Sequence, residues 1–135
     1  NRVRVPFGDA AALEEAFARD GSIGSLILET VQGGAGVIPW PAGFLKKVRE
    51  LCDRYGVLWI ADEVQCGYGR TGLFFAFEHE DVVPDIVTLA KSLGGGKTAI
   101  GAYVARTPVF MKAYGSPETA ISVERATQRS SAPSR

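Results

Sequence analysis

The chain has 135 residues, of which 46% are hydrophobic and 22% are charged, as is ordinary for one soluble globular domain. Its 15 basic and 15 acidic residues leave no basic field for nucleic acid or an anionic membrane, and its longest apolar runs are too short to span a bilayer. The two cysteines, Cys52 and Cys66, lack the spacing of metal ligands, so we expect free thiols in a reducing, cytoplasmic setting.

The apolar pattern predicts that helices and strands alternate along the chain. In chain order we expect a helix at 9–18, a buried strand at 23–30, a helix at 41–55, a buried strand at 57–62, a short helix at 74–79, a buried strand at 85–90, a strand at 100–105 and a helix at 108–114. Loops that contain glycine separate several of these elements. This alternation implies an α/β layer with a parallel or mixed sheet.

Local signals mark the ends of the first two helices. Asp9 can cap the first helix, and Gly21 lies just past its end. Pro41 occupies a favoured first-turn position of the second helix. Five apolar residues recur at helical spacing in that helix and predict its buried face: Phe44, Leu45, Val48, Leu51 and Cys52.

The end of the chain has a different composition from the rest. Residues 122–135 are rich in serine and arginine and almost free of apolar side chains, so we expect them to be disordered. The folded domain is therefore predicted to occupy residues 1–121.

An acid and an amine stand at the ends of two predicted strands. Asp62 ends the strand at 57–62, and Lys91 directly follows the strand at 85–90. Ligands of open α/β sheets bind beyond the carboxyl ends of the strands, so two parallel strands would bring both side chains to one edge. Because buried charges are costly unless they are paired or functional, the pair is either a structural ion pair or part of a site.

Three segments of the chain carry a family resemblance. They are residues 61–72, Ala-Asp-Glu-Val-Gln-Cys-Gly-Tyr-Gly-Arg-Thr-Gly, residues 89–96, Leu-Ala-Lys-Ser-Leu-Gly-Gly-Gly, and residues 28–33, Leu-Glu-Thr-Val-Gln-Gly. The first resembles the signature of the class III aminotransferases of the ornithine and acetylornithine type, the second resembles their cofactor-lysine segment, and the third resembles an upstream block. The order and spacing of all three fit. The resemblance covers residues 1–121. It implies the central part of a fold-type-I large domain, a three-layer α/β structure with a mainly parallel sheet.

The resemblance also implies pyridoxal 5'-phosphate as the cofactor and a role for each matched residue. Lys91 would bind the cofactor aldehyde and later move a proton between the substrate carbon and the cofactor carbon. Asp62 would keep the pyridine nitrogen protonated, Gln65 would hydrogen-bond the phenolic oxygen, and Val64 would pack against the ring. No metal is implied.

The implied reaction moves an amino group from an amine or amino acid to a 2-oxo acid, in a parent enzyme that acts as a homodimer. Two alternatives remain open, a non-catalytic remnant or interaction module of the same fold and a pyridoxal-phosphate-dependent aminomutase. Gly34 stands where many relatives carry a glutamate that pairs with a substrate-switching arginine, which argues against a dual-substrate mechanism of the ornithine type. The family's phosphate-binding segments lie outside the resemblance, so we expect this chain alone to bind the cofactor weakly.

Some residues imitate other sites. Residues 94–98, Gly-Gly-Gly-Lys-Thr, resemble the end of a phosphate-binding P-loop, but Lys91 occupies the position of the first glycine that the motif requires. We interpret Arg70 as a brace within its loop rather than a carboxylate anchor. We expect Trp40 to pack on the sheet, and Cys66 to be a small loop residue rather than a reactive thiol.

Overall fold

The computed structural model describes residues 2–115. The chain divides into two compact units that part between Val104 and Ala105. The predicted disorder of residues 122–135 falls outside the described residues and stays a prediction. No helix within residues 2–115 is long and apolar enough to cross a membrane.

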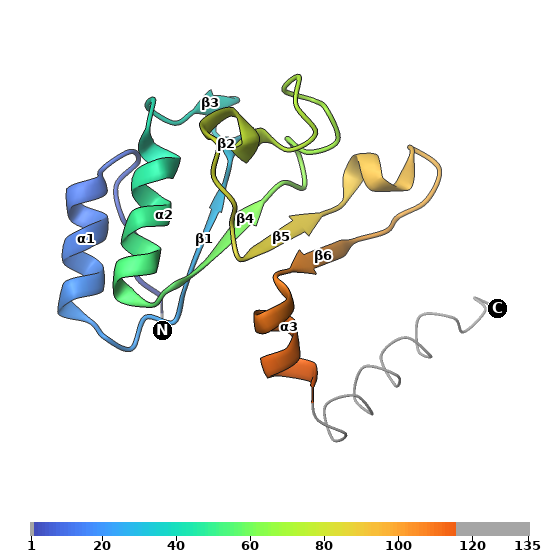
Figure 1. The fold of residues 1–135 in the computed structure, drawn as a ribbon. Coiled ribbons are helices and arrows are strands. Elements are labelled where there is room, and N and C mark those ends of the chain that lie inside the picture. Colours follow the sequence, from blue (N-terminus) through green and yellow to red (C-terminus); the bar gives the residue numbers. More distant parts are fainter. Residues whose placement is uncertain (1, 116–135) are drawn as a thin grey trace. The chain divides into compact units, whose positions relative to one another are not determined.

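The main sheet has four strands in the order β1-β4-β5-β6 (Figure 1). These are β1 (Ser25–Glu29), β4 (Leu58–Asp62), β5 (Ile86–Leu89) and β6 (Ala102–Ala105). Both β1 and β5 pair with β4 in parallel, and the register places Ile27, Ile60 and Ile86 side by side. The prediction of an α/β domain with a mainly parallel sheet is confirmed.

Two helices, α1 (Ala10–Arg19) and α2 (Phe44–Tyr55), lie side by side on one face of the sheet (Figure 1). The five residues of the predicted apolar face of α2 are all buried there. They pack with Trp59 of β4, whose side chain is 0% exposed, in the hydrophobic core. Within residues 2–104 the structure therefore shows two layers, the sheet and these two helices.

The two long helices begin differently. Asp9 caps α1 as predicted, because its Oδ1 atom accepts a hydrogen bond of 2.9 Å from the Ala12 N–H. The predicted start of α2 at Pro41 is wrong, since the helix begins at Phe44 after Gly43, which has a φ of 80°. Glu80 caps this helix from afar, as its carboxylate accepts 3.0 Å hydrogen bonds from the Gly43 and Lys46 N–H groups.

The predicted burial of the strands holds for one face of the sheet only. Residues under the helices, such as Trp59 and Ala61, are buried, and the alternate positions of β4 and β5 are half-buried. β1 forms as predicted but lies at the edge of the sheet, where Ile27 is 62% exposed. Because successive side chains of a strand point to opposite faces, Ile27 and Ile60 lie on the open face.

Short elements complete the fold. The strands β2 (Val31–Gln32) and β3 (Ile38–Pro39) form an antiparallel pair that the sequence did not predict. The predicted short helix at 74–79 is the 3₁₀ helix η1 (Ala76–Glu80), and a second, unpredicted 3₁₀ turn, η2 (Lys91–Gly94), directly follows Ala90. The predicted last helix is α3 (Thr107–Tyr114), in the second unit.

Candidate active site

Asp62 is the last residue of β4 and lies at the carboxyl edge of the sheet. It follows Ala61, which is buried under the helices, so its side chain belongs to the open face. The Val64 N–H donates a 3.0 Å hydrogen bond to its Oδ1 atom. Within residues 2–115, the Oδ2 atom has no hydrogen-bond donor, so one carboxylate oxygen is held in place and the other is available to a ligand.

Lys91 follows β5 at the same edge, as the parallel pairing of β4 and β5 requires. Its side chain is exposed, and its Nζ atom donates a 2.7 Å hydrogen bond to the Oε1 atom of Gln65. No ion pair joins Lys91 to Asp62 in the described part of the chain. The interpretation of the two residues as a structural ion pair is therefore not supported.

The Gln65 side chain that bonds to Lys91 passes close to the backbone of Gly33, which has no side chain to obstruct it. A Cβ atom on Gly33 would lie 2.4 Å from the Gln65 Nε2 atom, so the amide fits only because residue 33 is glycine. The Glu29 carboxylate accepts a 2.9 Å hydrogen bond from the Gly33 N–H and holds that glycine in place. Val64, between Asp62 and Gln65, is half-buried.

Glu63 is a buried anchor beside the candidate site, and the sequence interpretation missed it. Its side chain is 1% exposed and lies between the ends of three elements. The carboxylate accepts hydrogen bonds of 2.7 Å from the Thr30 hydroxyl and 3.1 Å from each of the Ala76 and Phe77 N–H groups. It therefore fixes the backbone beside Asp62. The sequence places an acid next to Asp62, but it gives no signal that Thr30, Ala76 and Phe77 are the buried partners of that acid.

Cys66 is a neutral thiol in this arrangement. Burial first, and then the nearby Glu63 carboxylate, raise the pKa of Cys66 to about 11. Burial likewise raises the pKa of Cys52 to about 12. Both cysteines are free, as expected, and neither is poised as a reactive thiolate.

The remaining singled-out residues have packing or bracing contacts. Arg70 donates a 3.1 Å hydrogen bond from Nη2 to the Ser92 hydroxyl, which supports its interpretation as a brace. Trp40 stacks between Phe7 and Phe44, with centroid distances of 4.3 and 4.6 Å. Trp40 therefore packs as expected.

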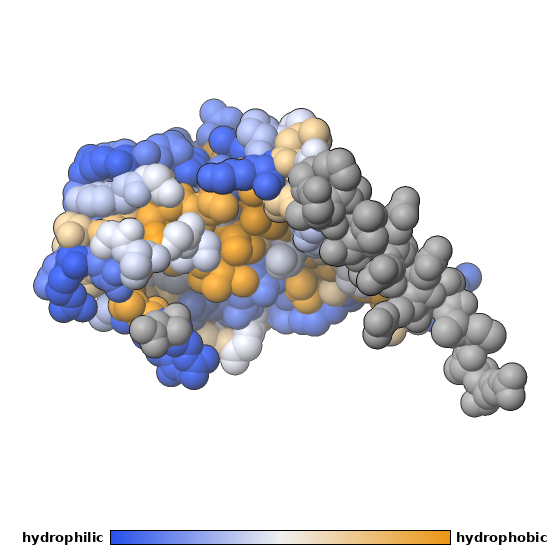
Figure 2. All heavy atoms as spheres, turned by 90° about the horizontal axis from the view of Figure 1, so that it is seen from below, coloured by the Kyte–Doolittle hydropathy of each residue, from blue (hydrophilic) through white to orange (hydrophobic). Residues whose placement is uncertain are grey.

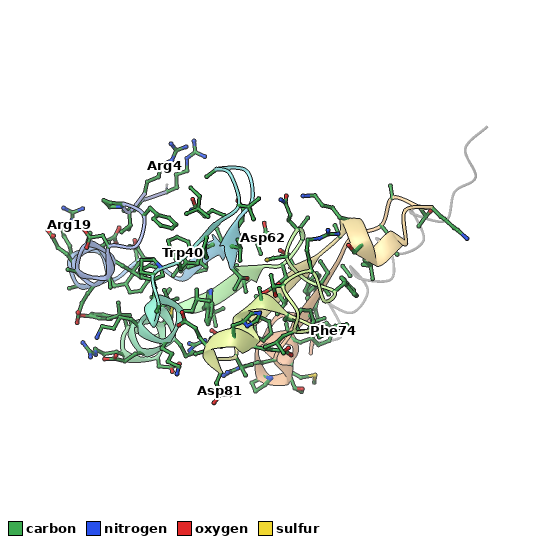
Figure 3. All side chains as sticks on the ribbon, turned by 90° about the horizontal axis from the view of Figure 1, so that it is seen from above. Arg4, Arg19, Trp40, Asp62, Phe74 and Asp81 are labelled. Carbon is green, nitrogen blue, oxygen red and sulfur yellow. The ribbon has the colours of Figure 1, made fainter. Side chains whose placement is uncertain are left out.

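Two hollows lie along β1. One of about 540 Å³ is lined by both polar and apolar residues of the N-terminal segment, α1 and β1, and none of the four predicted site residues lines it. Hydrophobic residues gather on the face of the molecule that Figure 2 shows. The other hollow, of about 570 Å³, is bordered by Asp62, Glu29 and Trp40 (Figure 3). Lys91 borders neither of the two and lines a separate hollow with Thr98 and Ile100.

The chain is an open α/β sheet with an acid and a lysine at the carboxyl ends of adjacent parallel strands, which is where ligands of such sheets generally bind. The family model of class-III aminotransferases matches residues 9–120. The chain belongs to the class-III aminotransferase family.

Named relatives agree with this assignment. The acetylornithine aminotransferase of Methanopyrus kandleri is 59% identical over 105 residues, which are 78% of this chain and 26% of that protein. The ornithine δ-aminotransferase of Plasmodium falciparum superposes with a TM-score of 0.78 at 41% identity, over 81% of this chain and 28% of that one. The acetylornithine aminotransferase of Elizabethkingia anophelis gives 0.77 at 45% identity, over 80% and 27%. The chain spans about a quarter of the length of these relatives.

Proposed function

We propose that this chain carries the lysine-bearing part of a pyridoxal-phosphate site, in an enzyme that transfers an amino group from an amine or amino acid to a 2-oxo acid. The observation that carries the proposal is the arrangement at the carboxyl edge. The Lys91 amine lies 2.7 Å from the Gln65 amide oxygen, just after the strand that pairs with the one ending in Asp62. Domain limits of 1–121 for the transferase part remain part of the proposal.

The polar groups of Asp62, Gln65 and Lys91 fit the chemistry of the cofactor. A pyridinium nitrogen needs an anionic acceptor, and the Asp62 Oδ2 atom has none of the described donors bound to it. A phenolic oxygen suits the amide of Gln65, and an aldehyde needs a primary amine, which Lys91 supplies. The open face also holds a buried Thr88 hydroxyl without a hydrogen-bond partner, in register with Asp62. The Thr88 hydroxyl beside the Asp62 carboxylate thus still lacks a hydrogen-bond partner.

When bound, pyridoxal phosphate supplies an electron sink for negative charge on the substrate carbon. Asp62 would accept a hydrogen bond from the ring nitrogen and so favour its protonated form. The Lys91 amine would hold the aldehyde group and would also serve as the base that takes a proton and the acid that returns it. The Gln65 amide would donate to the phenolic oxygen, and Val64 would pack against the ring.

The substrate and the assembly also belong to the proposal. Gly34 stands where many family members carry a glutamate, and a Cβ atom there would meet nothing within 4 Å, so a larger side chain would fit but is not present. Because glycine cannot pair with an arginine, we propose an enzyme without the ornithine-type substrate switch. From the family resemblance alone, we also propose that it acts as a homodimer in the cytoplasm. A non-catalytic remnant and an aminomutase are the outcomes that the experiment must separate.

The test is an absorbance titration of the chain with a large excess of pyridoxal phosphate, because weak binding is expected, followed by product analysis with a donor whose amino nitrogen is labelled. We expect a band of lysine-bound cofactor that is lost in Lys91→Ala and shifted in Asp62→Asn. Label that appears in the amino acid formed from a 2-oxo acid supports a transferase, and label that stays within the donor molecule indicates an aminomutase. A chain that gives no band at excess cofactor with Lys91 intact contradicts the proposal.

A further inference from the structure

The backbone of Lys91 adopts a conformation that lysine rarely adopts. Its φ is 44°, in the left-handed region, and only three other residues besides glycine share a positive φ within residues 2–115. The conformation belongs to the start of η2, just after Ala90. A strained backbone persists only where surrounding contacts hold it, and such strain is common at functional sites.

The contacts within the turn do not hold the side chain. Leu93 and Gly95 donate backbone hydrogen bonds of 3.0 Å to Ala90 and Ser92, which close the turn on itself. Neither bond fixes the position of the Lys91 amine relative to Asp62 at the carboxyl edge of the sheet. Contacts with another segment of the chain must fix that position.

Two successive residues of the turn are tied to one loop. The Lys91 Nζ atom donates to the Gln65 Oε1 atom at 2.7 Å, and the Ser92 hydroxyl accepts from the Arg70 Nη2 atom at 3.1 Å. Gln65 and Arg70 both belong to the segment 65–72, which follows β4. A single hydrogen bond leaves a side chain free to swivel, whereas two bonds on adjacent residues fix the orientation of the turn.

The segment 65–72 is itself anchored to the end of β4. The Gly67 N–H donates to the Glu63 carbonyl at 3.0 Å, and a Cβ atom on Gly67 would lie 2.9 Å from that oxygen. Gly69 donates a further 3.2 Å hydrogen bond to the Phe74 carbonyl. Side chains that bond to segment 65–72 are therefore held at a fixed position relative to Asp62.

We propose that Arg70 and Ser92 are positioning residues, whose hydrogen bond holds the Lys91 turn against segment 65–72 and sets the Lys91 amine at its working place relative to Asp62. The inference rests on the proposed function of Lys91 and adds two residues to it. Arg70 and Ser92 act through the backbone of Lys91, which immediately precedes Ser92.

The experiment uses Lys97 as an internal control, because this exposed lysine lies six positions beyond Lys91 in the same chain. The chain is treated with pyridoxal phosphate, trapped with borohydride and mapped by mass, and the ratio of label on Lys91 to label on Lys97 is measured. We expect Ser92→Ala and Arg70→Gln each to lower this ratio by about two- to tenfold, the effect of one ordinary hydrogen bond. The double variant should be no worse than either single one, because both remove the same contact.

A conservative variant and an exchange measurement separate positioning from general damage. Ser92→Thr keeps the hydroxyl and should retain a ratio near that of the wild type. Amide exchange at Leu93 and Gly95 should speed up in Ser92→Ala, while the amides of β4 stay protected and the melting temperature is unchanged.

Each outcome decides one claim. If the wild type shows no preference for Lys91 over Lys97, the proposed function fails. If the wild type prefers Lys91 and both variants keep that preference, the function stands and the positioning role is overturned. A loss of preference that also occurs in Ser92→Thr, with a lower melting temperature, overturns the positioning role as well.

Discussion

Replacing Glu63 tests whether the carboxyl edge is held by a buried network. Glu63→Ala removes an acceptor that serves the Thr30 hydroxyl and the Ala76 and Phe77 N–H groups, and all four residues are buried or partly buried. The two amides belong to the first turn of η1, where no acceptor within the turn is available to them. The variant therefore leaves three donors without a protein partner.

The magnitude follows from these contacts. A buried donor without a partner costs about 1–3 kcal/mol, and water that enters the emptied space recovers part of that cost. We expect Glu63→Ala to lower the free energy of unfolding by about 3–5 kcal/mol, a large share of the 5–15 kcal/mol typical of small proteins. Glu63→Gln should cost about 2 kcal/mol, because its NH₂ group would face an amide N–H. Thr30→Val should cost about 1–2 kcal/mol.

The assay is urea unfolding followed by tryptophan fluorescence, because Trp59 is 0% exposed in the core and reports its opening. Glu15→Gln is the matched control, since Glu15 is an exposed acid on α1. The control should change stability by less than about 0.5 kcal/mol. A Glu63→Ala variant as stable as the control would refute the interpretation of Glu63 as a buried anchor.

Three further outcomes are expected. Burial raises the pKa of Cys66 to about 11 and of Cys52 to about 12, so a thiol reagent at pH 8 should modify both cysteines only after the chain unfolds. The reactivity of both thiols should rise with pH. Rapid labelling of the folded chain at pH 8 would contradict the protection by burial. Gly33→Ala should displace the Gln65 amide and reduce cofactor labelling of Lys91 while the melting temperature changes little; unchanged labelling would remove Gly33 from the site. Asp85→Ala removes the acceptor of two 2.8 Å hydrogen bonds, one from Arg49 and one from the Trp59 N–H. It should lower the free energy of unfolding, measured in urea, by about 3 kcal/mol. An unchanged free energy of unfolding would show that these two hydrogen bonds are dispensable.

Local signals in the sequence predicted much of the fold and the place of Asp62 and Lys91 at one edge of the sheet. The first helix was predictable because Asp9 caps it within three residues. The place of Asp62 and Lys91 was predictable because each ends or follows an apolar run and parallel strands share an edge. The roles came from the family resemblance, and the site assignments themselves remain proposals.

The features that the sequence did not predict depend on distant partners. The start of α2 is set by Glu80, which is 37 residues from Gly43, and the role of Glu63 depends on Thr30, which is 33 residues away. The one-sided burial of β4 depends on which layers pack against the sheet, and an apolar run alone does not specify them. The left-handed backbone of Lys91 likewise has no sequence signal, because lysine gives no hint of a positive φ.

The most direct test of the central claim is borohydride trapping of pyridoxal phosphate on the chain, with Lys91→Ala and Lys97→Ala compared as a matched pair. We predict that the label maps to Lys91, is lost in Lys91→Ala and persists in Lys97→Ala. Label that maps to Lys97 and survives Lys91→Ala would contradict the assignment of Lys91 as the cofactor-bearing lysine.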